Sequence, residues 1–257
     1  MIIAIDIGNT NIVLGCMDPE DGRLYFTARL ASDRLKTSDE YAALMRNMFI
    51  LNQVERHGIE GSIISSVVPT LTVTIKDAIR QLCGKESLVV GAGLKTGLNI
   101  VMDNPAQLGS DLVTDAVAAA AEYPKPILIF DLGTATTISV VDKRGNYIGG
   151  MIVPGISISL EALSSRTSQL PHVNLEGPKR LIGTNTVDCM KSGIVYGNAA
   201  MMDGMIQRIT EELGEPPTVV ATGGLAPSIT KYCRSRIICD SDLILKGLRI
   251  LYNKNKA

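Results

Sequence analysis

Apolar runs alternate with short polar turns along most of the chain, and two of these runs precede nearly the same polar sequence. Residues 2–5 (IIAI) lead into the turn DIGNTN, and residues 127–130 (ILIF) lead into the turn DLGTAT. Each turn is followed by a second apolar run and then by a polar turn, MDPEDG in the first copy and DKRG in the second. Short apolar runs bounded by turn residues are typical of buried strands. The pattern therefore predicts one strand–turn–strand unit that occurs twice.

The rest of the first half predicts further strands and helices. Besides the two paired strands at 2–5 and 12–16, the strands are expected at 24–30, 62–69 and 88–90, and the helices at 38–54 and 70–82. Ser38 is expected to cap the first helix because its hydroxyl can accept a hydrogen bond from the first turn. Residues 91–105 are rich in Gly and Asn, which predicts a long loop, and such loops in compact folds are often functional.

One further helix precedes the second half, which then repeats this order of elements. A helix is expected at 106–123, then strands at 127–130, 137–141 and 147–153, a helix from about Ser157, a loop at 169–180, a Met-rich helix at 186–213, strands at 218–221 and 237–239, and a closing helix at 243–252. Because strands and helices alternate within two similar halves, the sequence predicts an α/β fold with an internal duplication. The repeat divides the chain into domains 1–122 and 123–257.

Composition narrows the class of protein. Of the 257 residues 46% are hydrophobic, but no apolar run reaches the roughly 18–20 residues that span a bilayer. Without a basic leader or membrane segment, a cytoplasmic protein is expected. The 25 basic and 26 acidic residues nearly balance, aromatic residues make up 4% and Trp is absent, which argues against a nucleic-acid partner. The five Cys lack any C-x-x-C pair, so they are expected to be reduced rather than to bind zinc.

The repeated turns are the strongest candidates for chemistry. Small residues let backbone N–H groups approach a phosphate, and an acid beside them can hold a cation. A third turn, ATGGLA at 221–226, places Gly223 and Gly224 where the chain can pass flat against an adenine or a ribose. Taken singly, Asp-Gly turns also mark ordinary hairpins, and the third turn is consistent with a plain strand-to-helix connection. The recurrence of the acid directly after a strand favours a nucleotide clamp.

The three turns together resemble the superfamily of acetate and sugar kinases, heat-shock protein 70 and actin, in which ATP lies in a cleft between two duplicated domains. Within it, the chain resembles the type III pantothenate kinases from residue 1 to about residue 252, through the further motifs NPAQLGSD (104–111), GGMIVPG (149–155), SSRTSQLP (164–171) and GTNTVDCMKSG (183–193). The resemblance implies a duplicated actin-like, ribonuclease H-like ATPase fold with two domains. It also implies a homodimer that phosphorylates pantothenate with ATP, Mg²⁺ or Mn²⁺, and a monovalent cation, K⁺ or NH₄⁺, in the first step towards coenzyme A.

The resemblance assigns roles to individual residues. The phosphate-binding turn is formed by Asp6, Ile7, Gly8, Asn9, Thr10, Asn11, Ile12 and Val13, with Asp6 near the divalent cation. Thr134, Gly223 and Gly224 contact the nucleotide from the second half, and Asp131 holds the monovalent cation. Asp111 is the catalytic base. The acceptor pocket is lined by Met102, Gly109, Ser110, Asp111, Leu112 and Thr186.

An ordinary Asp is a weak base towards an alcohol, because its carboxyl group has a pKa near 3.9, roughly ten units or more below the pKa of an alcohol. Phosphoryl transfer is largely dissociative, so the carboxylate can orient the hydroxyl and accept its proton late. Without the resemblance, Asp111 would be interpreted as a carboxylate at the start of a helix.

Two positions depart from the family pattern. The family commonly has an Arg directly after this Asp and a Tyr nine residues before it, where this chain has Leu112 and Met102. The loss of a charge-assisted hydrogen bond costs on the order of 1.5–3 kcal/mol. Arg166 is a candidate replacement cation, and its alternative interpretation is a solvated loop charge.

Two other functions therefore stay open: a related kinase with a different small hydroxylated acceptor, and a nucleotide-binding regulator without catalysis. The presence of Asp6, Asp111, Asp131 and Thr134 together argues against the regulator. For the expected dimer, the Met-rich stretch 201–209 is a candidate packing face, although ordinary core packing is its default explanation.

Overall fold

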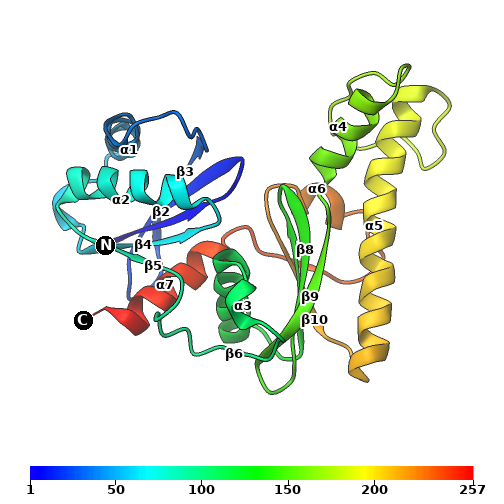
Figure 1. The fold of residues 1–257 in the computed structure, drawn as a ribbon. Coiled ribbons are helices and arrows are strands. Elements are labelled where there is room, and N and C mark those ends of the chain that lie inside the picture. Colours follow the sequence, from blue (N-terminus) through cyan, green and yellow to red (C-terminus); the bar gives the residue numbers. More distant parts are fainter. Residues whose placement is uncertain (257) are drawn as a thin grey trace. The chain divides into compact units, whose positions relative to one another are not determined.

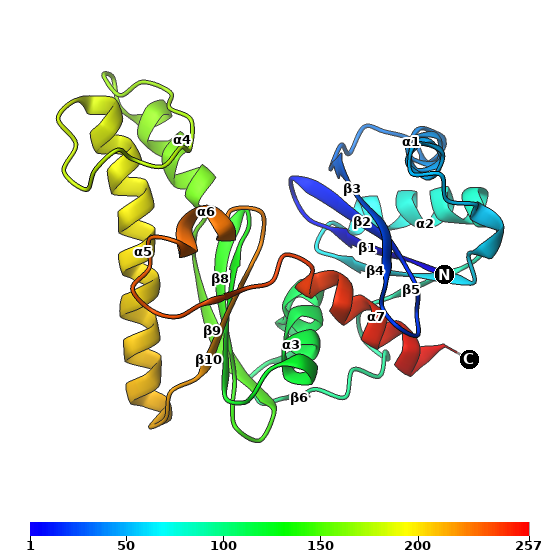
Figure 2. The same cartoon turned by 180° about the vertical axis from the view of Figure 1, so that it is seen from behind.

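The computed structural model describes residues 1–256, which form two compact units, each built around one sheet (Figures 1 and 2). Unit 1 comprises residues 1–98, 103–121 and 242–256, and unit 2 comprises residues 99–102 and 122–241. The expected α/β class is confirmed. The division expected from the repeat differs from these units in three places, since residues 99–102 and Glu122 belong to unit 2 and the C-terminal helix belongs to unit 1.

The sheet of unit 1 has the strand order β3-β2-β1-β4-β5. Its strands are β1 (Ile2–Ile7), β2 (Asn11–Met17), β3 (Leu24–Ala31), β4 (Gly61–Ser66) and β5 (Ser87–Val89). The first three strands form an antiparallel meander, whereas β4 runs parallel to β1 and β5 runs parallel to β4. The helices are α1 (Ser38–Leu51), α2 (Pro69–Cys83), α3 (Ser110–Glu122) and α7 (Leu243–Asn255), with short 3₁₀ turns at Arg56–Gly58 and Pro105–Gln107.

Side-chain alternation along β1 separates the two faces of this sheet. Ile3, Ile5 and Ile7 join the buried core formed with α1 and α2, so Ala4 and Asp6 point to the opposite face. Helix α7 packs against β1 and β4. The C-terminal helix thus covers the sheet of unit 1, because its apolar side (Leu245, Leu248 and Leu251) is buried there.

The sheet of unit 2 has the order β11-β10-β7-β8-β9-β6. Its strands are β6 (Asn99–Ile100), β7 (Ile127–Leu132), β8 (Ala135–Val141), β9 (Asn146–Pro154), β10 (Thr218–Thr222) and β11 (Ile238–Cys239), and its helices are α4 (Ile156–Arg166), α5 (Thr186–Leu213) and α6 (Ala226–Thr230). Strands β7 to β11 repeat the order and directions of β1 to β5. The duplication expected from the sequence is therefore present in the topology of both sheets.

Several local boundaries differ from expectation. Strands β1 and β7 each run two residues beyond the apolar run, so Asp6 and Asp131 are the last residue but one of a strand. The N-cap of α1 is Thr37 rather than Ser38, because the Glu40 N–H donates to the Thr37 hydroxyl while the Thr37 N–H donates to the Glu40 carboxylate. The helix expected from residue 106 begins at Ser110, after a separate 3₁₀ turn.

Candidate active site

The first acid turn lies at the carboxyl end of β1. The Gly8 N–H donates to the Asn11 carbonyl at 3.0 Å, and the Ser32 hydroxyl donates to the Gly8 carbonyl at 2.6 Å. The side chains of Ile7 and Ile12 are fully buried in the core, whereas residues 9–11 are exposed. Among the predicted phosphate-binding residues, the two isoleucines therefore anchor the turn, and the residues between them that reach the surface are residues 9–11.

Asp6 lies beside β4 in the sheet. In the parallel register between the two strands, Asp6 is paired with Ser65 and Ile7 with Ser66. Paired residues on adjacent strands point to the same face, so the Ser65 hydroxyl is on the face of Asp6. Ser65 is fully buried.

Helix α3 is attached to this end of β4 through its first residue. The Ser110 hydroxyl accepts a hydrogen bond from the Ser66 N–H and donates one to the Ser66 carbonyl, both at 3.0 Å, and its oxygen lies 3.2 Å from the Ser65 Oγ. One donor and two acceptor interactions use the full capacity of a hydroxyl. Asp111 follows directly, so the predicted base and Asp6 belong to the same end of one sheet. Ser65 was not among the predicted residues; its only signal was a pair of serines ending an apolar strand.

The Asp111 carboxylate turns back over the start of its own helix. Its Oδ1 accepts a hydrogen bond from the Leu112 N–H at 2.9 Å, and a Cβ on Gly109 would overlap the same oxygen. Burial raises the pKa of Asp111 above its ordinary value, against the opposing effect of the Leu112 and Asp111 N–H groups. A carboxyl group with a raised pKa is a better proton acceptor than an ordinary one and is a candidate general base.

The second acid turn, in unit 2, gathers three of the predicted nucleotide residues. Asp131 is paired with Thr222 of β10, and a Cβ on the following residue, Gly223, would lie 2.5 Å from the Asp131 Oδ1. A Cβ on Gly155 would overlap the Thr134 carbonyl, so the turn after β9 lies directly against Thr134. Close approach of the backbone requires glycine at both positions.

The remaining predicted residues are distributed over both units. Gly109, Ser110 and Leu112 are in unit 1, whereas Met102, Thr186 and Gly224 are in unit 2. Thr186 is the exposed first residue of α5, after the N-cap Asn185. Arg166 is the exposed last residue of α4.

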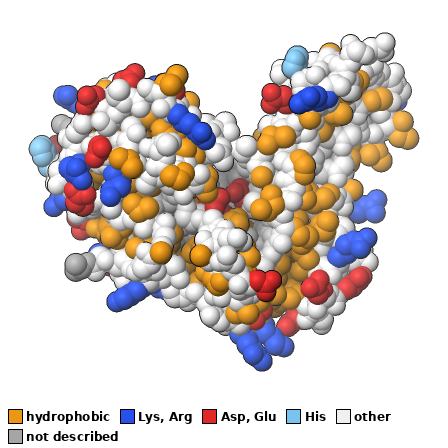
Figure 3. Space-filling model, viewed as in Figure 1, with side chains coloured by type: hydrophobic (Ala, Val, Ile, Leu, Met, Phe, Trp, Pro, Cys, Tyr) orange, Lys and Arg blue, Asp and Glu red, His pale blue; other side chains and the backbone are white. Residues whose placement is uncertain are grey.

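Exposed apolar side chains gather on α4 and around the start of α5 in unit 2. In the half of Figure 3 that holds these helices, hydrophobic side chains are numerous on the surface. The exposed large side chains there are Ile158, Leu163, Leu181, Ile182 and Val187. Within 201–209, by contrast, Met202 and Ile209 are buried, and Met201, Met205 and Ile206 pack against the same core. The Met-rich stretch is therefore a core face.

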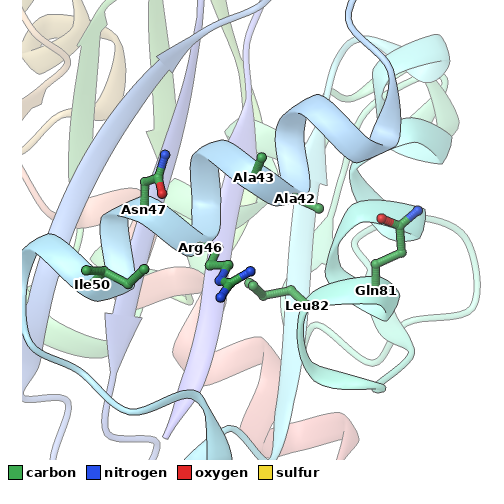
Figure 4. A pocket seen from close by; sticks show the side chains of 7 residues that line it. All are labelled: Ala42, Ala43, Arg46, Asn47, Ile50, Gln81 and Leu82. Atoms are coloured by element: carbon green, nitrogen blue, oxygen red, sulfur yellow. The ribbon is translucent and has the colours of Figure 1, made fainter.

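A cavity of about 520 Å³ lies between α1 and α2 (Figure 4). Its lining comprises Ala42, Ala43, Arg46, Asn47, Ile50, Gln81 and Leu82, and it includes none of the predicted site residues.

Among residues 1–256, no three His, Cys, Asp or Glu side chains gather closely enough to hold a metal ion by themselves. In the same part of the chain, no helix has the length and apolar character needed to cross a membrane.

Solved structures share this fold at low sequence identity. The activator of the 2-hydroxyisocaproyl-CoA dehydratase from Clostridium difficile, solved with ADPNP bound, has a TM-score of 0.56 and 13% identity and covers 99% of this chain and 94% of its own. The ethanolamine utilization protein EutJ from Carboxydothermus hydrogenoformans has a TM-score of 0.56 and 14% identity, covering 97% and 89%. With the repeated sheet order and its two acid turns, the chain has the two-domain actin-like fold of ATPases and sugar kinases.

Sequence comparison narrows this class to one family. The sequence model of the type III pantothenate kinases matches residues 2–208. The type III pantothenate kinase of Exiguobacterium sp. strain AT1b is 43% identical over 256 residues and covers 100% of both chains. That of Moorella thermoacetica is 43% identical over 259 residues and covers 99% of this chain and 100% of its own. The chain belongs to the type III pantothenate kinase family.

Proposed function

We propose that the chain transfers the γ-phosphoryl group of ATP to the primary hydroxyl of pantothenate, forming 4′-phosphopantothenate, the first step towards coenzyme A. The observation that carries this proposal is the attachment of α3 to β4 through Ser110, next to the strand that bears Asp6. A candidate base and a candidate phosphate turn thereby share one end of a sheet. Phosphoryl transfer depends mainly on such positioning and on charge neutralisation.

On the nucleotide side, the turn formed by residues 6–13 holds the phosphates through its exposed residues 9–11, while Ile7 and Ile12 anchor it in the core. Asp6 would hold Mg²⁺ or Mn²⁺, which suits a site with one carboxylate. The bound cation would supply positive charge against the charge of the phosphates. In unit 2, Asp131 holds K⁺ or NH₄⁺, and the turns at Thr134 and at Gly223–Gly224 contact the nucleotide.

On the acceptor side, Asp111 orients the pantothenate hydroxyl and accepts its proton late in the transfer. The raised pKa of Asp111 supports this role, because it makes the carboxylate a stronger base than an ordinary Asp. Gly109, Ser110 and Leu112 contact the acceptor from unit 1. Met102, Thr186 and Arg166 of unit 2 are further candidates for acceptor contacts, with Arg166 in place of the cation that pairs with the pantothenate carboxylate.

We further propose that the chain is a cytoplasmic homodimer without nucleic-acid or membrane partners. Its packing face is the set of exposed apolar side chains on α4 and around the start of α5, rather than the candidate stretch 201–209. Exposed large apolar side chains on neighbouring elements are candidates for an interaction surface. Analytical ultracentrifugation at micromolar concentration tests the oligomeric state, and a monomer would contradict the proposed homodimer.

The substrate is tested by measuring ATP consumption with pantothenate, pantetheine or pantoate, each with and without K⁺. Turnover that depends on pantothenate and K⁺ is expected. ATP consumption with pantetheine or pantoate but not with pantothenate would instead indicate a related kinase. No ATP consumption with any of the three acceptors would indicate a nucleotide-binding regulator.

The base is tested by Asp111→Asn, which is expected to retain ATP binding and lose transfer by about 10²- to 10⁴-fold. Asp39→Asn, which removes an exposed carboxylate from the first turn of α1, is the matched control and is expected to keep full turnover. Wild-type turnover in Asp111→Asn would refute the role of Asp111.

A further inference from the structure

We propose that α7 positions Asp111, and that Gly247 is the positioning residue through which α7 acts. This inference rests on the proposed function, since it takes Asp111 as the group that touches the acceptor hydroxyl. It concerns the C-terminal helix, which carries none of the residues assigned to the site.

The evidence begins at the point where α3 meets α7. A Cβ on Gly247 would overlap the Thr114 carbonyl oxygen and would lie 2.7 Å from the Thr114 Cγ2 and 2.8 Å from its carbonyl carbon. Thr114 is fully buried, and Gly247 is buried as well. A backbone carbonyl inside a helix cannot rotate away from an added side chain, so any residue larger than glycine at 247 must displace one of the two helices.

Helix α7 is held by contacts along most of its length. Leu245, Leu248 and Leu251 are buried on the sheet side. The Arg249 Nη1 donates to the Pro19 and Glu20 carbonyls at 3.3 and 3.0 Å. The Asn255 side chain accepts from the Lys95 N–H and donates to the Lys95 carbonyl, both at 2.9 Å. These contacts oppose a movement of α7, so at least part of the displacement would fall on α3.

A displacement at Thr114 is transmitted to Asp111 within one helical turn. The Thr114 Oγ1 donates to the Ser110 carbonyl at 2.6 Å, and Ser110 is the residue whose hydroxyl holds α3 to β4. Asp111 lies between these two points. The contact with Gly247 and the Ser110 hydroxyl therefore define where the Asp111 carboxylate stands relative to β4. A misplacement of about 1 Å in a reacting group can lower a rate by about 100-fold.

The test is Gly247→Ala compared with Gly15→Ala. The three atoms nearest to a Cβ on Gly15 all belong to the Leu245 side chain, with Cδ1 at 2.9 Å and Cδ2 at 3.0 Å, so this control adds a methyl group at a different contact of α7. We expect Gly247→Ala to lower kcat by about 10- to 100-fold while the KM for ATP changes by less than about twofold. We expect Gly15→Ala to keep the wild-type kcat, although both variants lose thermal stability.

A folded Gly247→Ala protein with wild-type kcat would overturn the proposal, and so would an equal loss of kcat in Gly15→Ala. If Gly247→Ala does not fold, Thr114→Ile is used instead, because it enlarges the α3 side of the same contact. Thr114→Ile is expected to show the same loss of kcat with an unchanged KM for ATP. A wild-type kcat in Thr114→Ile would equally overturn the proposal. Asp111→Asn, measured in parallel, distinguishes a failure of the proposed base from a failure of the proposed positioning role of Gly247. An active Asp111→Asn refutes the assignment of the base, whereas an inactive Asp111→Asn beside an unaffected Gly247→Ala refutes only the positioning role.

Discussion

Gly223 is the position in unit 2 where a single methyl group should disturb both the fold and the nucleotide side. It follows β10 with a φ of 89°, which L-residues rarely adopt. A Cβ there would lie 2.5 Å from the Asp131 Oδ1 and 2.7 and 2.8 Å from the backbone carbon and nitrogen of Leu132. Gly223→Ala must therefore push either the Asp131 carboxylate or the end of β7.

The cost can be estimated from two contributions. The left-handed backbone conformation costs a non-glycine residue about 1 kcal/mol, and overpacking against a backbone costs about 1–3 kcal/mol. Gly223→Ala is thus expected to lower the free energy of unfolding by about 2–4 kcal/mol. Gly214 separates the two contributions, because it has a φ of 73° and nothing within 4 Å of its Cβ position. Gly214→Ala is expected to cost only about 1 kcal/mol.

The two variants are compared by urea unfolding, and their turnover is measured as ATP and K⁺ are titrated. Gly223→Ala, but not Gly214→Ala, is expected to need more ATP and more K⁺ for half-maximal turnover, because only the first displaces Asp131. Equal losses of unfolding free energy in both variants would refute the contact with the Asp131 turn. Wild-type ATP and K⁺ dependence in a folded Gly223→Ala protein would refute the placing of nucleotide and cation at this turn.

Two further predictions concern the proposed carboxylates. Asp111 must be ionised to act as a base, and burial raises its pKa. As the pH is lowered, we therefore expect kcat/KM to begin to fall at a pH above the ordinary titration range of Asp. A kcat/KM that stays constant down to that range would contradict the assignment of Asp111 as the base. Asp131→Asn is expected to lower turnover and to abolish its response to K⁺, measured by titrating KCl at constant ionic strength. A wild-type K⁺ response in that variant would show that the cation is held elsewhere.

The features predicted correctly were those encoded by neighbouring residues. Apolar runs and turn residues located β1, β2, β7 and β8, because strand patterning and turn chemistry are local properties. Two short elements were missed, β6 with two residues and α6 with five, and each is too short to show a period. The cap of α1 was misplaced by one residue, since Thr37 and Ser38 are both acceptable caps and only the hydrogen bonds with Glu40 distinguish them.

The sequence by itself determined the duplicated α/β order, the two acid turns and the membership of the kinase family. Only the tertiary structure decided that Ser65 and Ser110 join the strand of Asp6 to the helix of Asp111, and that the C-terminal helix returns to unit 1. The physical reason is that hydrophobic periodicity shows which face of an element is buried but not which element covers it. Contacts such as that of Gly247 with Thr114 join residues far apart in the chain, and they are decided when helices and sheets pack at close range.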